Sequence, residues 1–186
     1  MASVGSIGTP VYHHRCDDAV VGVDVSYFDL AIETVLRNEG GYKPATPEDS
    51  GGETNWGISQ RSFPDVDIRN LTRQAAIDIY HQHYWLPVYG KIASQAVATR
   101  VLDMAVNMGA HQAHRIVQLA LRGLGFHDTS IDGSFGDDTL TKVNGIAEAR
   151  LLPELKAQAC LWYATLACAK PEKRPNLLGW IRRTVQ

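Results

Sequence analysis

The chain has 186 residues, of which 45% are hydrophobic and 20% charged. These values are typical of one soluble globular domain with a sizeable core, with room for a small appendage. Because 18 basic residues stand against 20 acidic ones, the formal net charge is only -2, which gives no reason to expect nucleic acid or an anionic membrane as partner. No apolar run approaches the roughly eighteen residues of a membrane span.

Three cysteines, Cys16, Cys160 and Cys168, are too few and too scattered for a disulfide framework. Cys160 and Cys168 fall in a segment that reads as one helix, which separates their Cα atoms by about 12 Å, beyond disulfide reach. We therefore expect reduced thiols, as in a protein that folds in the cytoplasm. No Cys/His cluster indicates zinc, and the sequence predicts no metal and no cofactor.

Residues 1–25 are predicted to form a flexible leader, because they are rich in Gly, Ser, Pro and His. They lack the basic n-region and the long apolar h-region of a secretory signal. The stretch VVGVDV, residues 20–25, has the composition of a short strand. If the substrate lies outside the cytoplasm, another component must export the protein.

The first helix is predicted to run from Ser26 to Glu39. Ser26 is a favourable N-cap, with Asp29 at the capping-box position. Apolar residues recur at helical spacing on one face, namely Phe28, Ile32, Val35 and Leu36. Glu39 continues that apolar stripe in the last turn, and Gly40 and Gly41 then provide a left-handed C-cap.

A long irregular segment, residues 40–70, follows this helix and is rich in Gly, Pro, Asp, Ser and Thr. Loops of this length are usually functional or disordered, and we expect at most one small hairpin within them. Apolar spacing predicts further helices over residues 73–85 (capped by Thr72), 93–108, 113–125, 137–149 and 153–169. The predicted fold class is therefore mostly α. Beside the apolar face of the helix over residues 93–108 lies a polar strip, made of Arg100, Asp103 and Asn107.

Glu39 is the first candidate for chemistry. Partial desolvation on an apolar stripe and the negative end of the helix dipole both disfavour its anion. A carboxyl group that keeps its proton near neutral pH is what a general acid requires. The two glycines that follow lack side chains, so a bulky ligand can approach closely. From these features alone, a solvated glutamate beside an ordinary glycine cap is an equally good interpretation.

The residues after Glu39 carry an ordered set of uncommon types: Glu39-Gly40-Gly41-Tyr42, then Asp49-Ser50-Gly51-Gly52-Glu53-Thr54, then Asn55-Trp56-Gly57-Ile58. This order and spacing resembles the signature of the glycoside hydrolase family 108 muramidases. The stretches IYHQHYW (79–85) and LDMAVNMG (102–109) fit the same family. LGFHDTSIDGSFGDDTL (124–140) resembles its module predicted to bind peptidoglycan, and GWIRR (179–183) fits as well. The resemblance covers about residues 27–184.

Carried over residue by residue, the resemblance makes Glu39 the catalytic glutamate and assigns the acidic and hydroxyl positions of the loop to Asp49 and Thr54. One extra residue, in KPATPE, separates Gly41 from Asp49. Glu48 therefore competes with Asp49 as the second carboxylate. Asp49 is favoured because it keeps its place relative to Thr54.

Candidate substrate-binding residues are Tyr42, Trp56 and Asn107. Aromatic rings suit the apolar face of a pyranose, although core packing is the default for aromatics. Asn107 is placed either to bind an N-acetyl group or to cap its helix. His81 and His83 face opposite sides of a predicted helix, which favours surface or packing roles over a metal pair.

The resemblance implies a lysozyme-like catalytic region over residues 26–112, in which a small β-hairpin or long loop carries part of the active site. It also implies a helical peptidoglycan-binding module over residues 113–186, packed on the catalytic region. The partners expected are peptidoglycan glycan strands, with no nucleic acid and no integral membrane segment, and we expect a monomer.

The implied activity is that of a muramidase, a lysozyme-type glycoside hydrolase. It cleaves the β-1,4 bond between N-acetylmuramic acid and N-acetylglucosamine by general acid catalysis, as a phage endolysin does. Two alternatives stay open: a lytic transglycosylase that uses the same glutamate, and a non-catalytic wall-binding protein. Without a signal, an endolysin would accumulate in the host cytoplasm and reach the peptidoglycan in the periplasm after release by a holin.

Overall fold

The structure, a computed structural model, describes residues 27–45 and 52–186. Four sequence predictions fall outside these residues: the leader with its strand, Cys16, the Ser26 cap, and the two competing acids Glu48 and Asp49.

Helices dominate the described chain, as predicted, and one small antiparallel hairpin accompanies them. The helices are α1 (Phe28–Glu39), α2 (Arg73–Tyr84), α3 (Gln95–Met108), α4 (Ala110–Gly123), α5 (Asp137–Asn144), α6 (Glu148–Ala169) and α7 (Leu177–Val185), with short 3-10 helices η1 (Tyr89–Lys91) and η2 (Pro171–Asn176). The hairpin pairs β1 (Thr54–Asn55) with β2 (Ile58–Ser59).

The start of α1 differs from the prediction, whereas its end agrees. Tyr27 occupies the N-cap position and makes no side-chain capping bond. The predicted apolar face is buried through Ile32, Val35 and Leu36. The helix ends at Glu39, as predicted, because Gly40 adopts φ 75° and its N–H donates to the Leu36 carbonyl.

Side-chain caps start the next two helices. The Thr72 hydroxyl accepts from the N–H of Ala75, which confirms the predicted cap of α2. The Ser94 hydroxyl accepts from the N–H of Val97, so α3 starts at Gln95 rather than at the predicted residue 93. Capping thus fixes both starting points.

The last three helices depart furthest from the sequence prediction. α5 ends at Asn144, before Gly145, whereas the prediction extended to residue 149. α6 begins at Glu148 and includes Pro153, which was predicted to start it. Leu151 and Leu155, one turn apart, are both fully buried, so packing holds the helix together despite the hydrogen bond that proline removes. α7 was not predicted as a separate helix.

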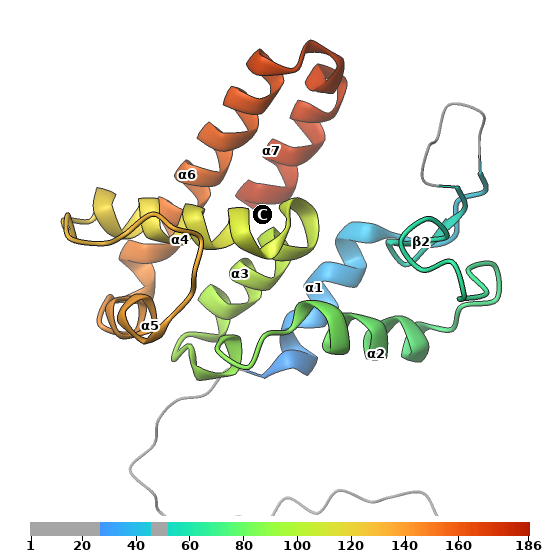
Figure 1. Ribbon diagram of the computed structural model, residues 1–186, viewed down its shortest axis with the longest axis horizontal. Coiled ribbons are helices and arrows are strands. Elements are labelled where there is room, and N and C mark those ends of the chain that lie inside the picture. The colour runs from blue at the N-terminus through green and yellow to red at the C-terminus, as the bar shows by residue number, and fades with distance from the viewer. Residues whose placement is uncertain (1–26, 46–51) are drawn as a thin grey trace, which may run out of the picture.

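Two hydrophobic clusters form the core, and both include residues of α3. The first is formed by α1, α2 and the hairpin, with Leu102 of α3. The second joins η1, α4 and α6 to neighbouring positions of α3, such as Val101 and Ala105. Figure 1 shows the result, with α3 between α1 and α2 on one side and α4 and α5 on the other.

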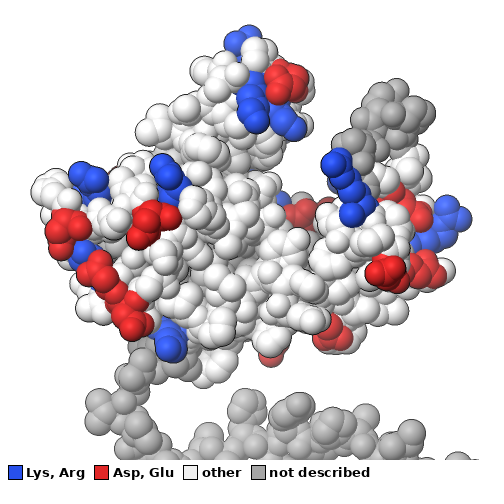
Figure 2. All heavy atoms as spheres, viewed as in Figure 1, with Lys and Arg blue, Asp and Glu red and all other residues white. Residues whose placement is uncertain are grey.

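α6 and α7 run side by side and project away from the rest of the protein (Figure 1). The space-filling view shows a notch between this pair and the lobe that carries the hairpin, while acidic and basic side chains lie scattered over the visible face (Figure 2). Among the described residues, no helix combines the length and apolar character needed to cross a membrane. Cys160 and Cys168 of α6 are free thiols, as expected.

Candidate active site

Glu39 lies at the C-terminal end of α1, and its side chain is 20% exposed. The last two apolar positions before it, Val35 and Leu36, are buried, whereas Glu39 itself reaches solvent. The carboxyl group is therefore partly desolvated yet accessible, as predicted from its register.

The hairpin turn packs directly against this carboxyl group. Trp56 and Gly57 form the turn with φ 51° and 78°, and positive φ at both central residues is what the common two-residue hairpin turn requires. A Cβ atom on Gly57 would lie 2.7 Å from Cγ and 2.8 Å from Oε2 of Glu39. The glycine therefore leaves the space that the glutamate occupies.

Tyr80 of α2 holds the turn in this position. Its hydroxyl donates to the Trp56 carbonyl oxygen at 2.9 Å, and the side chain is fully buried. Burial, followed by the charge of Glu39, raises the pKa of both Tyr80 and its neighbour Tyr84. Both phenols are thus protonated near neutral pH, and Tyr80 acts as a hydrogen-bond donor.

An arginine from the other end of the chain binds the same carboxyl group. Arg183 of α7 places Nη1 2.7 Å from Oε1 of Glu39. Its Nε and Nη2 lie 3.1 and 2.9 Å from Oδ1 of Asp103 on α3. One guanidinium therefore bridges two carboxylates on two helices.

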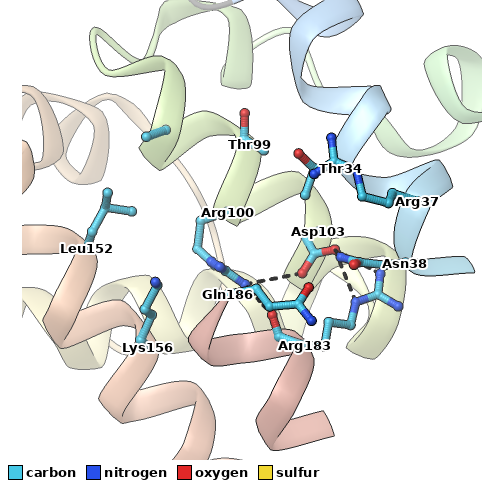
Figure 3. A pocket seen from close by; sticks show the side chains of 11 residues that line it. Thr34, Arg37, Asn38, Thr99, Arg100, Asp103, Leu152, Lys156, Arg183 and Gln186 are labelled. Atoms are coloured by element: carbon cyan, nitrogen blue, oxygen red, sulfur yellow. Dashed lines mark hydrogen bonds and ion pairs between the residues drawn. The ribbon is translucent and has the colours of Figure 1, made fainter. Parts of the chain in front are cut away.

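Two further side chains lie against the carboxylate of Asp103 (Figure 3). Nδ2 of Asn38 donates to its Oδ1 at 2.9 Å, and Nη1 of Arg100 lies 3.4 Å from its Oδ2. The side chain of Asp103 is only 4% exposed, so these partners compensate the cost of burying its charge. Burial disfavours the cation of Arg183, but Asp103 and Glu39 outweigh that effect and raise its pKa.

This arginine changes the electrostatic expectation for Glu39. The sequence indicated only effects that disfavour the anion, namely desolvation and the helix dipole. The guanidinium of Arg183 adds an opposite charge beside the carboxyl group, which the sequence did not indicate. This guanidinium is shared between Glu39 and Asp103.

Thr54 lies in β1, where its backbone pairs with Ser59 on one side and exchanges hydrogen bonds of 2.7 and 2.9 Å with Lys43 on the other. The adjacent Asn55 is buried and donates to the carbonyls of Ile68 and Leu71. Because side chains alternate along a strand, Thr54 faces away from that core. Its strand and the Glu39 side chain thus flank the same hairpin turn, while Asp49 lies outside the described residues.

The predicted substrate-binding residues are separated in the structure. Tyr42 is 40% exposed, and its hydroxyl donates to Glu53 at 2.7 Å. Trp56 is partly buried in the turn beside Glu39. Asn107 instead donates from Nδ2 to the hydroxyl of Tyr163 on α6 and lines a cavity of about 540 Å³ with Arg183. Of these three, Trp56 belongs to the turn that contacts the glutamate.

The two histidines of α2 pack against separate aromatic rings. The His81 ring lies 4.7 Å from that of Phe28, and His83 lies 5.2 Å from Phe63. Over residues 27–45 and 52–186, no group of three or more His, Cys, Asp or Glu side chains is arranged to hold a metal ion.

Comparison with known proteins identifies the two parts of the chain. Residues 32–109 match the family model described as glycosyl hydrolase 108, and residues 112–185 match the one described as predicted peptidoglycan domain. The chain is a glycosyl hydrolase 108 protein with a predicted peptidoglycan domain. It is therefore a glycoside hydrolase that acts on peptidoglycan, and peptidoglycan is its partner.

A solved structure supports this assignment. SagA from Brucella abortus is 27% identical in sequence, with a TM-score of 0.63. The match covers 85% of this chain and 93% of the SagA chain. No match is found among curated proteins. The predicted mostly helical, lysozyme-like fold with a small hairpin is thus confirmed for this glycosyl hydrolase 108 protein.

The roles of three residues around Glu39 were not predicted from the sequence: Gly57 and Arg183, which lie against it, and Tyr80, which holds the turn. For Asp103, the sequence signal is its position on the polar strip of the helix over residues 93–108. A carboxylate that is buried beside Arg100 needs positively charged partners. The sequence does not indicate that one of them comes from α7.

Proposed function

We propose that this glycosyl hydrolase 108 protein cleaves the β-1,4 bond between N-acetylmuramic acid and N-acetylglucosamine, with Glu39 as general acid. The observation that carries the proposal is the partly exposed Glu39 carboxyl group, fixed between the turn at Gly57 and the guanidinium of Arg183. Glu39 would donate its proton to the leaving glycosidic oxygen while an oxocarbenium-like centre develops on the sugar.

Glu39 has to carry a proton when it acts as the general acid. Two features of the site act in the required direction. Asp103 competes for the same guanidinium, and sugar rings over the site would exclude water and raise the cost of a charged carboxylate. Peptidoglycan binding is therefore expected to favour the protonated form of Glu39.

The loop residues complete the proposed mechanism. Ionised Asp49 would stabilise the positive charge on the sugar or activate water, and the Thr54 hydroxyl would position that water. A separation of about 5–5.5 Å between the two carboxyl groups would predict retention of configuration, and about 6.5–9.5 Å would predict inversion.

Substitution of each acid of the loop tests whether Asp49 or Glu48 is the second carboxylate. Asp49→Asn is expected to lower kcat on purified peptidoglycan by about 10²-fold, in the range for a catalytic carboxylate, whereas Glu48→Gln should stay within about twofold of the wild type. Initial rates of turbidity loss measure both. A large loss in Glu48→Gln with normal Asp49→Asn activity would assign the role to Glu48 instead.

Solubilisation of purified peptidoglycan tests the enzyme proposal against a non-catalytic wall-binding protein. The wild-type protein should clear a peptidoglycan suspension and release soluble muropeptides. A protein that sediments with the wall but leaves its turbidity unchanged over hours would be a binder. The predicted peptidoglycan domain fits either outcome, whereas the fixed carboxyl group of Glu39 supports the enzyme.

A lytic transglycosylase is the second candidate, and the Arg183 pair is the observation that favours it. In such an enzyme the same glutamate acts first as acid and then as base, and the hydroxyl of the muramic acid attacks its own anomeric carbon. An ionised carboxylate beside Arg183 suits the base step. The products distinguish the two reactions, because only the transglycosylase leaves anhydromuramyl ends.

For the biological role we propose an endolysin that lyses the bacterial host cell. The protein would accumulate in the host cytoplasm as a monomer with reduced thiols and reach the peptidoglycan after a holin-type pore opens. The free Cys160 and Cys168 support folding in a reducing compartment. Fractionation of producing cells tests this role: the protein should remain in the cytoplasm until the inner membrane is permeabilised.

A further inference from the structure

We propose that Arg183 is a positioning residue for Glu39, so that the last helix of the peptidoglycan domain completes the active site of the glycosyl hydrolase region. The inference rests on the proposed function and adds to it a role for a residue 144 positions further along the chain. It concerns the orientation of the carboxyl group rather than contact with the sugar.

The geometry fixes one oxygen of Glu39. Nη1 of Arg183 lies 2.7 Å from Oε1 of Glu39. Oε2 lies beside Gly57, 2.8 Å from the point that a Cβ atom would occupy if residue 57 had a side chain. An otherwise flexible glutamate side chain is thus restrained from both sides. Oε2 is the oxygen left without the guanidinium, so it is the atom from which a proton can be transferred.

Arg183 is itself held rigidly. Its Nε donates to Oδ1 of Asp103 at 3.1 Å, and Nη2 lies 2.9 Å from the same oxygen without a hydrogen bond of its own. Its backbone carbonyl accepts from Nη1 of Arg100 at 3.3 Å. The Arg183 side chain is only 14% exposed, and that of Asp103 only 4%. Figure 3 shows Arg100, Asp103 and Asn38 gathered around it. A guanidinium with two occupied edges is a fixed support, unlike a surface ion pair.

Simultaneous contact with two carboxylates, through Nη1 to Glu39 and Nε to Asp103, explains why arginine is needed at this position. A lysine carries one compact charge and cannot offer separate N–H groups to Glu39 and Asp103 in a fixed plane. Misplacing a catalytic group by about 1 Å can cost on the order of 10²-fold in rate. We therefore expect Arg183→Met to reduce kcat by about 10–100-fold with KM nearly unchanged, and Arg183→Lys to restore only part of kcat.

The test measures kcat, KM and the pH–rate profile of the full chain on purified peptidoglycan. Removing the cation favours the protonated form of the neighbouring carboxyl group, so the alkaline limb of the profile should move to higher pH in Arg183→Met and stay in place in Arg183→Lys. Asp103→Asn, which frees Arg183 on one edge, should also lower kcat. Arg150→Met on α6 is the matched control, because the Arg150 side chain is exposed and forms no hydrogen bond or ion pair with another described residue.

A purely structural role of Arg183 would lower thermal stability without moving the pH limb. If Arg183→Met does not fold, Arg183→Lys and Asp103→Asn still decide the question. The inference is overturned if all three variants keep wild-type kcat and pH profile, or if kcat rises, which would indicate a restraining contact. Failure of the proposed function looks different: the wild type then releases no fragments, or Glu39→Gln remains active.

Discussion

Glu39→Gln is expected to remove nearly all release of soluble fragments from peptidoglycan. The amide keeps the size of the side chain and its place at the end of α1 but has no proton of suitable acidity to donate. General acid catalysis typically contributes about 10²–10⁴ in rate, so the loss of kcat should reach at least that range. Initial rates of turbidity loss on purified peptidoglycan provide the measurement.

Glu33→Gln is the matched control on the same helix. Glu33 lies on the exposed face of α1 and pairs with Arg73 of α2, and surface ion pairs of this kind contribute little stability. This variant should clear peptidoglycan at the wild-type rate. Glu39→Gln should still sediment with the wall and unfold at a temperature close to that of the wild type. Substantial activity in Glu39→Gln would reject Glu39 as the acid.

Gly57→Ala should have the second largest effect, although the substitution adds only one methyl group. The new Cβ atom would lie 2.5 Å from Oη of Tyr80 and 2.7 Å from Cγ of Glu39, at a backbone position with φ 78°. Either the glutamate or the hydroxyl that holds the turn must move. Displacing the glutamate by about 1 Å can cost on the order of 10²-fold in kcat, and the backbone strain adds about 1–3 kcal/mol of destabilisation.

Gly136→Ala separates the site effect from a general loss of glycine. A Cβ atom there meets nothing within 4 Å, and the residue has φ -88°, which any amino acid adopts. The Gly136→Ala protein should retain the wild-type kcat and a melting temperature within a few degrees of the wild-type value. A Gly57→Ala protein as active as the wild type would show that the contact between turn and glutamate has no role in catalysis.

The features of the site that follow from local sequence were predictable. The end of α1 follows from an apolar stripe and a glycine cap, and both lie within about three turns of Glu39. The hairpin lies in a segment whose Gly-rich composition already excluded a helix. Thr72 was recognised as a cap from residue type and position alone, and its hydroxyl does accept from Ala75.

The contacts that complete the site were not predictable, because they join distant segments. Arg183 reaches Glu39 through α7, a nine-residue helix with a glycine inside it and a 3-10 helix before it. Such a helix gives a weak local signal, and only packing against α6 and α3 determines its place. Likewise, Gly57 reads as an ordinary turn residue until Tyr80 and Glu39 are seen to fill the space beside it.

Mass spectrometry of peptidoglycan digested by the wild-type protein tests the central claim most directly, because it reports bond and reaction together. The account predicts disaccharide muropeptides that end in reducing N-acetylmuramic acid and are absent from the Glu39→Gln digest. Anhydromuramyl ends, reducing N-acetylglucosamine ends, or fragments in the Glu39→Gln digest that match those of the wild type would contradict it.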